Sequence, residues 1–176
     1  MSDSKASANQ VLANMMARKA ALGSPAPSQP DHHELGWPCL LMRVGQHWFG
    51  VRAEHVREVV VPEAITRVPA QPEHVLGVSL VHGRLVPVVD IGKMLVDVPV
   101  AMTGERGRRL AVLSHGESEI GAVADEAKGV IELPAPEPNS TPESTPPYVL
   151  GEVRWERELV ILFDVGILIA TAIGME

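Results

Sequence analysis

Short apolar runs separated by glycine-containing turns fill the chain from Trp37 onward, and this pattern limits the possible folds more than any other feature. Three pairs of runs flank the turns Gly45-Gln46, His82-Gly83-Arg84 and His115-Gly116-Glu117, an arrangement typical of β-hairpins. Many short strands joined by such turns indicate an all-β sandwich or barrel. We expect strands at residues 39–44, 48–51, 56–61, 74–81, 85–91, 109–113, 119–124, 128–133, 150–155 and 159–163.

The composition agrees with a strand-rich core and excludes several classes of protein. Of the 176 residues, 45% are hydrophobic, and valine, a β-branched residue that favours strands, occurs 24 times. The single cysteine, Cys39, can form neither an internal disulfide nor a CxxC metal site, and we expect it to be a buried, unreactive thiol. The net charge of −7 argues against nucleic acid and anionic membranes as partners.

No stretch predicts insertion into a membrane. Residues 159–175 are the most apolar, but they contain Asp164 and are fewer than the ~20 residues that a spanning helix needs. We interpret them as a buried strand at 159–163 and a helix at 165–173. The first residues lack the apolar core of a secretion signal, so we expect a cytoplasmic protein.

Residues 1–36 differ in character from the rest and form a predicted N-terminal extension, followed by a domain at residues 37–173. Apolar residues spaced by three and four predict a short helix before Gly23, and the proline-rich residues 24–30 predict an extended tether. This extension is either a frayed tail or a segment that docks on the domain or on a partner.

Individual aspartates and prolines within the domain predict further local features. Asp90 and Asp164 each precede a helical stretch, and we interpret them as helix caps and not as a catalytic carboxylate pair. Pro87 lies inside an apolar strand, which should therefore be at a sheet edge or carry a bulge. Six prolines in residues 134–147 predict an exposed loop.

Signals for an enzyme or a metal protein are weak. The chain has no GxxxxGK, GxGxxG, GxSxG or HExxH motif. Its seven histidines are scattered, and nothing in their spacing would bring three or four of them to one ion. We therefore predict no catalytic residues, no metal and no cofactor. The residues alone indicate a binding module.

Several strings of residues resemble the CheW-like family of chemotaxis coupling proteins. The resemblance covers roughly residues 39–169, and the strings follow the order found in that family: Val56-Arg57-Glu58-Val59-Val60, Ile65-Thr66-Arg67-Val68-Pro69, Val75-Leu76-Gly77-Val78, Gly83-Arg84-Leu85-Val86-Pro87-Val88-Val89-Asp90, Ile120-Gly121-Ala122-Val123-Ala124-Asp125-Glu126-Ala127, Gly129-Val130-Ile131 and Leu159-Val160-Ile161-Leu162-Phe163-Asp164.

The resemblance implies a fold of two five-stranded, SH3-like β-barrel subdomains on a shared aliphatic core, with short helices. It also implies a non-enzymatic adaptor that links the hairpin tips of methyl-accepting chemoreceptors to the regulatory domain of a CheA-type histidine kinase. One barrel would dock on the kinase domain, and a groove between the lobes would take the receptor helix. Such contacts gain strength from multivalency in an array.

Carried over position by position, the resemblance assigns Val59 and Val60 to apolar partner contacts and Leu80, His82, Gly83 and Arg84 to a partner-facing turn. Each is also compatible with a plain core or turn role. The family motif Asn-Leu-Arg-Gly is here Leu80-Val81-His82-Gly83, so histidine replaces an arginine that carries a fixed charge and five donors.

This departure leaves a second hypothesis open. The chain could be a divergent CheW-like adaptor of a non-flagellar motility, pilus-control or polar-localisation pathway. A β-barrel enzyme or metal protein is a third class, which the missing motifs argue against.

Overall fold

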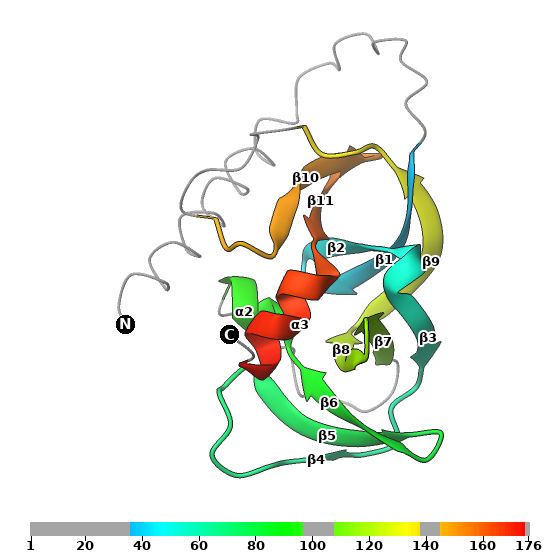
Figure 1. The fold of residues 1–176 in the computed structure, drawn as a ribbon. Helices are drawn as coiled ribbons and strands as arrows, with labels where there is room; N and C mark the ends of the chain where they lie inside the picture. The colour runs from blue at the N-terminus through cyan, green and yellow to red at the C-terminus, as the bar shows by residue number, and fades with distance from the viewer. Residues whose placement is uncertain (1–35, 97–107, 138–144, 175–176) are drawn as a thin grey trace, which may run out of the picture.

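The computed structural model describes residues 36–96, 108–137 and 145–174, and it is mostly β (Figure 1). The predicted N-terminal helix and tether lie outside the described residues. The elements are β1 (Trp37–Val44), β2 (His47–Arg52), η1 (Ala53–His55), β3 (Val56–Val60), β4 (Ile65–Thr66), β5 (Val75–Val81), β6 (Arg84–Val89), α2 (Ile91–Val96), β7 (Arg109–His115), β8 (Ser118–Ala124), β9 (Glu126–Leu133), β10 (Val149–Trp155), β11 (Glu158–Phe163) and α3 (Val165–Ile173).

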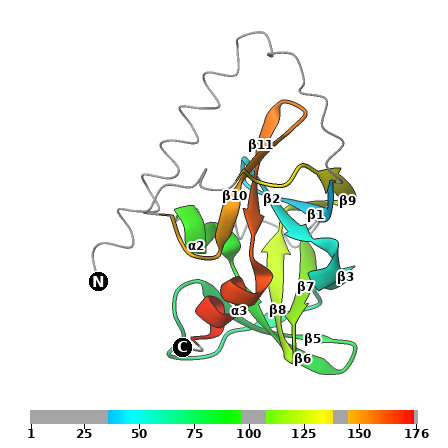
Figure 2. The same cartoon turned by 45° about the horizontal axis from the view of Figure 1, so that its top comes forward.

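The strands form two sheets, which confirms the all-β prediction of two β subdomains. One sheet has the order β10-β11-β2-β1-β9 and the other the order β3-β7-β8-β6-β5-β4. Most neighbours are antiparallel hairpin partners, but β11 pairs with β2 and β6 with β8 in parallel. These two parallel pairs join segments that are far apart in the sequence, and both sheets curl strongly (Figures 1 and 2).

All three predicted hairpins are present, but Arg84 and His115, expected in turns, are strand residues, so each turn has two residues. In the β1–β2 hairpin Val44 pairs with His47, which leaves Gly45 and Gln46 as a two-residue turn. In the β5–β6 hairpin Val81 pairs with Arg84, and both turn residues have positive φ, 47° at His82 and 79° at Gly83. Positive φ at both central positions is the type I′ geometry that matches the twist of paired strands.

The second sheet contains one strand more than the five expected. This strand, β4, has two residues, too few for a recognisable period of apolar side chains. It pairs with β5, where a Cβ on Gly77 would lie 2.1 Å from the carbonyl oxygen of Thr66. With φ at +141°, Gly77 is a position that only glycine fills without strain, and it allows the two backbones to approach.

Aliphatic and aromatic side chains from both sheets share one core, as the family resemblance implies. It includes Val86, Val88 and Leu110 of the six-stranded sheet and Phe49 of the five-stranded sheet. Phe49 stacks on Phe163 with ring centroids 5.5 Å apart. A second cluster fills the curl of the five-stranded sheet and consists of Cys39, Leu41, Trp48, Leu133, Val153, Val160 and Leu162.

Both predicted helix caps are present. An Asp164 oxygen accepts a hydrogen bond from the backbone N–H of Ile167 at 2.9 Å, and Asp90 accepts one from Lys93 at 3.1 Å. Helix α3 spans Val165–Ile173 as predicted and ends at Gly174, whose φ is 67°. Within the described parts of the chain, neither helix has the length and apolar character needed to span a membrane.

Proline positions are only partly as expected. The strand that contains Pro87, β6, lies inside its sheet, so the edge-strand prediction is wrong. However, β8 pairs with β6 only at Val88 and Val89, so Pro87 has no partner residue on β8. On the other side of β6, the pairing with β5 is irregular between Val75 and Gly77. In the proline-rich segment, residues 134–137 and 145–147 are not strand, and the rest lies outside the described residues.

Candidate partner-binding surface

Charged side chains join three elements of the six-stranded sheet. Arg84 of β6 reaches both Glu119 of β8 (Nη1 to Oε2, 2.6 Å) and Glu58 of β3 (Nη2 to Oε1, 3.2 Å). His82 in the β5–β6 turn approaches the other Glu58 oxygen, with 2.8 Å between Nε2 and Oε2. Arg57 lies 3.8 Å from Glu119. We call these five residues the charged seam.

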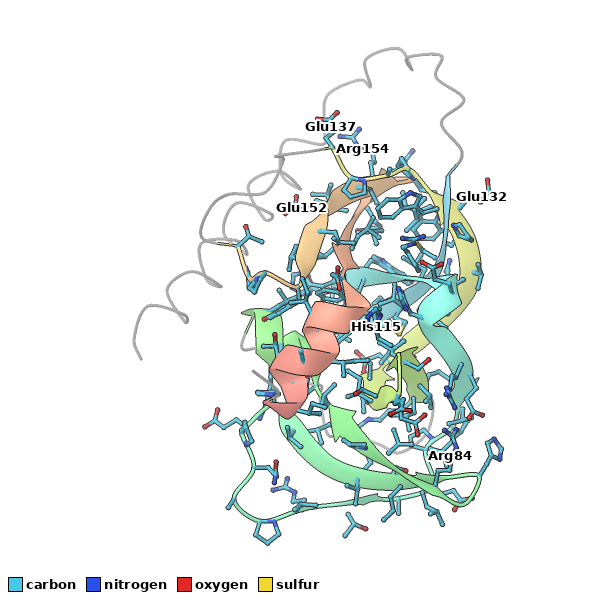
Figure 3. All side chains as sticks on the ribbon, in the orientation of Figure 1. Arg84, His115, Glu132, Glu137, Glu152 and Arg154 are labelled. Atoms are coloured by element: carbon cyan, nitrogen blue, oxygen red, sulfur yellow. The ribbon has the colours of Figure 1, made fainter. Side chains whose placement is uncertain are left out.

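The fold explains why the seam exists. Strand β3 is at one edge of the sheet, and the β5–β6 hairpin lies near the opposite edge. Because the sheet curls, the two regions approach each other (Figure 1). Strand β3 does not pair with β5 or β6, so side chains make the contact between them. Arg84 lies directly after the hairpin turn, and Figure 3 shows it at this end of the hairpin. The turn geometry therefore decides where its guanidinium group reaches.

An exposed apolar pair lies next to the charged seam. Leu80 of β5 and Leu85 of β6 are cross-strand partners and are 52% and 69% exposed. Val59 of β3 and Val61, the residue after this strand, are also exposed. Exposed apolar side chains grouped on neighbouring strands are typical of surfaces that another protein covers.

The structure separates the residues that the resemblance assigned to partner binding. Leu80, His82 and Gly83 are exposed at the hairpin end, and Arg84 is half-buried in the charged seam. Val59 faces outward, whereas Val60 packs against the shared core. Val60 is thus partly buried in this fold, and the other five residues lie at or beside the charged seam or on β3.

Sequence reasoning missed four residues of this surface: Arg57, Glu58, Leu85 and Glu119. The two glutamates bridge to Arg84 from positions far apart in the sequence, so no local pattern revealed them. Leu85 could have been found, because a two-residue turn at His82-Gly83 fixes Leu80 and Leu85 as cross-strand partners on one face.

Cys39 has none of the features of a nucleophile or metal ligand. It is fully buried, and burial raises the pKa of its thiol to about 11, against a smaller lowering by the Arg52 guanidinium. At neutral pH the group is thus a neutral thiol, and the thiolate is the form that attacks or binds metal. Among the described residues, no cluster of three or more histidine, cysteine or acidic side chains could hold a metal ion.

The described histidines serve other contacts. The His55 and His115 rings lie 5.4 Å apart, and a Cβ on Gly166 of α3 would lie 3.1 Å from two atoms of the His115 ring (Figure 3). Nε2 of His74 lies 3.1 Å from the carbonyl oxygen of Ala172, near the other end of α3. These two contacts position α3 against the six-stranded sheet.

Comparison with known proteins identifies the family. A model of the CheW-like domain matches residues 38–172. The chain belongs to the CheW-like family. The chain is 23% identical over 141 residues to the chemotaxis protein CheW of Klebsiella aerogenes. The matched region covers 78% of this chain and 84% of that protein. It is 30% identical over 135 residues to Protein FrzA of Myxococcus xanthus, covering 74% and 83% respectively.

The fold agrees with this assignment. The crystal structure of the scaffolding protein TtCheW from Thermoanaerobacter tengcongensis superposes with a TM-score of 0.63 and 19% identity, covering 74% of this chain and 90% of that one. The chain is therefore a CheW-like scaffold protein, a member of a family of non-enzymatic adaptors.

Proposed function

We propose that this chain is a non-enzymatic adaptor that links chemoreceptor hairpin tips to the regulatory domain of a CheA-type histidine kinase. The CheW-like family membership supports an adaptor role in general. The observation that carries the proposal is the exposed Leu80–Leu85 pair beside the charged seam. Such an adaptor would work in the cytoplasm at receptor arrays, with no cofactor.

The surface has the physical properties that a docking face needs. Burying Leu80 and Leu85 under a partner removes apolar area from water, which favours association. Arg84 is already held by two carboxylates, so binding need not order its long side chain. Alternation along β6 turns Leu85 away from the face that carries Arg84, so the apolar pair and the charged seam are two neighbouring contact areas of one hairpin.

His82 is the residue of this surface most open to a partner. It is 71% exposed and keeps one ring nitrogen against Glu58. An arginine at this position offers a permanently charged fork to a carboxylate, and histidine offers fewer donors. We therefore expect a receptor contact that is weaker, or tuned to a different partner, than that of family members with arginine.

Co-sedimentation tests the proposal directly. The full chain is mixed with a CheA-type kinase and with a receptor cytoplasmic fragment, separately and together. We expect binding to both, weakened by Leu85→Asp at the apolar pair and, for the receptor, by His82→Ala. Val130→Asp is the control, because Val130 is also exposed (58%, against 69% for Leu85) but lies on β9 of the other sheet. Equal binding by all variants would contradict the assignment of this surface.

A second candidate is a divergent adaptor of a non-flagellar motility, pilus-control or polar-localisation pathway. It is favoured by the altered Leu80-Val81-His82-Gly83 turn and by the match to Protein FrzA, which is not named as a chemotaxis protein. Binding to the kinase without affinity for chemoreceptors would favour this candidate over the first.

The division of the chain into an extension of residues 1–36 and a CheW-like domain of residues 37–173 is part of the proposal. The start of the family match at residue 38 supports it. We expect limited proteolysis of the full chain to cut within residues 24–30 and to leave the domain intact.

A further inference from the structure

The loop between β4 and β5 forms a pocket of about 440 Å³ on the six-stranded sheet. Ile65, Val75 and Leu76 line it from the two strands, and Lys93 lines it from α2. The rest of the lining comes from the loop itself and consists of Arg67, Val68, Ala70, Gln71, Pro72 and Glu73. A volume of this size is within the ~300–1,000 Å³ typical of ligand pockets.

Both ends of the loop are anchored, which keeps the pocket open. At its start, Gly77 lets β4 lie against β5. At its end, the Val75 N–H donates to the Pro72 carbonyl at 2.9 Å, and the Asp90 N–H donates to the His74 carbonyl at 2.8 Å. Between these anchors Ala70 has φ of 59°, a left-handed conformation that a non-glycine residue holds only where its surroundings enforce it.

The lining combines apolar side chains with cations that have no carboxylate partner. Ile65, Val75 and Leu76 are half-buried, and Val68 is exposed at the rim. In the described part of the chain, Arg67 makes no ion pair, and Nζ of Lys93 reaches only the backbone carbonyl of Glu73, at 3.4 Å.

Four arginines elsewhere in the described structure are paired with carboxylates, unlike the two cations of the pocket. Arg43, Arg52, Arg57 and Arg84 each have a carboxylate within 4.0 Å. The whole chain has a net charge of −7, so acidic groups are abundant elsewhere. Two cations over an apolar floor, offset only by Glu73, are complementary to a ligand that carries carboxylates next to an apolar group.

We propose that the β4–β5 pocket binds an acidic, apolar peptide segment of a partner protein. A bulky apolar side chain would contact Ile65, Val75 and Leu76, and flanking carboxylates would pair with Arg67 and Lys93. The pocket is at the Val75 end of β5, and six residue steps put it ~20 Å from the Val81 end next to His82. It is therefore a site distinct from the charged seam, and both can be occupied together.

Nuclear magnetic resonance of the full-length chain tests the pocket with three capped peptides. The first, Ala-Glu-Leu-Phe-Glu-Ala, has the proposed chemistry; the second replaces glutamate with lysine, and the third replaces leucine and phenylalanine with alanine. We expect the first peptide to shift the methyl signals of Ile65, Val68, Val75 and Leu76, and the other two to leave them unchanged. Saturable shifts with all three, or with none at millimolar concentration, would overturn the proposal.

Charge reversal of the cations tests the polar part. Arg67→Glu with Lys93→Glu should weaken binding of the first peptide about tenfold or more and give the lysine peptide measurable affinity. The residues Arg67 and Lys93 line an open pocket, and Lys93 donates its hydrogen bond to Asp90 from the backbone N–H. We therefore expect the double substitution to leave the fold intact. Arg154→Glu on β10 is the matched control and should bind like the unmodified chain. Equal loss in the control would refute the site.

Discussion

Glu58 of β3 and His82 of the β5–β6 turn lie in contact across the curl of the six-stranded sheet, with 2.8 Å between Oε2 and Nε2. The second oxygen of Glu58 faces Arg84, so one carboxylate connects an edge strand to a hairpin that is paired elsewhere. Side-chain contacts of the charged seam thus help to hold β3 against the β5–β6 hairpin. That relationship links the stability of the fold to the residues proposed to meet a partner.

Arg84→Met tests how much the charged seam contributes to stability. The change leaves the half-buried carboxylates of Glu58 and Glu119 without their main partner. Because Arg84 is itself 39% exposed, we expect a loss of about 1–2 kcal/mol in the free energy of unfolding, measured with urea. Arg154→Met, at an exposed position on β10, should cost less than about 0.5 kcal/mol. Equal stability of the two variants would show that the charged seam contributes nothing.

Gly77→Ala should disrupt the pairing of β4 with β5. The added methyl would overlap the Thr66 carbonyl oxygen, and alanine at φ +141° is strained in addition, so we expect a loss of at least about 2 kcal/mol. Gly129→Ala separates the two effects, because Gly129 also has positive φ, at +104°, but has no atom within 4 Å of the added methyl. It should cost about 1 kcal/mol. Urea denaturation compares them, and similar losses would argue against the close approach.

Lys128 should help to close the five-stranded sheet. The edge strands of that sheet are β9 and β10, and Nζ of Lys128 on β9 lies 5.2 Å from the centre of the Trp155 ring on β10. Lys128→Met removes this cation–π contact and should lower the free energy of unfolding by about 0.5–1 kcal/mol. Lys128→Arg should retain most of it. If the methionine variant unfolds at the same urea concentration as the unmodified chain, the contact is not stabilising.

Cys39 should be inert in the native protein. Its pKa of about 11, against an ordinary value of 9.0, lowers the thiolate fraction about 100-fold at about pH 8, and burial blocks access as well. We expect negligible alkylation by iodoacetamide in buffer and rapid alkylation in urea, followed by mass spectrometry. The raised pKa also implies that stability falls as the pH rises from about 9 towards 11, because only the unfolded thiol ionises readily there. Rapid labelling of the native chain would contradict the buried position.

Much of the fold was predictable because its determinants are local. Short turns with glycine predicted the β1–β2 and β5–β6 hairpins, although the second turn was expected to include Arg84. Aspartate before an apolar helix predicted the caps at Asp90 and Asp164. Strand β4 was not predicted, because a strand of two residues is too short to show a periodic pattern of apolar side chains. Its presence depends on Gly77, seen in the sequence only as part of a family string.

The candidate surface was predictable only in part. Family resemblance pointed to the hairpin end at His82 and Gly83, which the structure leaves exposed. It also grouped Val59 with Val60, although alternation along β3 sends these neighbours to opposite faces. Val59 is therefore the more exposed of the two, and Val60 is partly buried against the shared core.

The sequence by itself determined the strands, the turns, the helix caps and the valine-rich core, because each depends on residues within a few positions of one another. Only the tertiary structure decided that β11 lies beside β2, that Glu58 and Glu119 meet at Arg84, and that Arg67 and Lys93 share a pocket without a carboxylate partner. These arrangements join segments distant along the chain. Their geometry follows from how the two sheets curl and pack on a shared core, which no local pattern encodes.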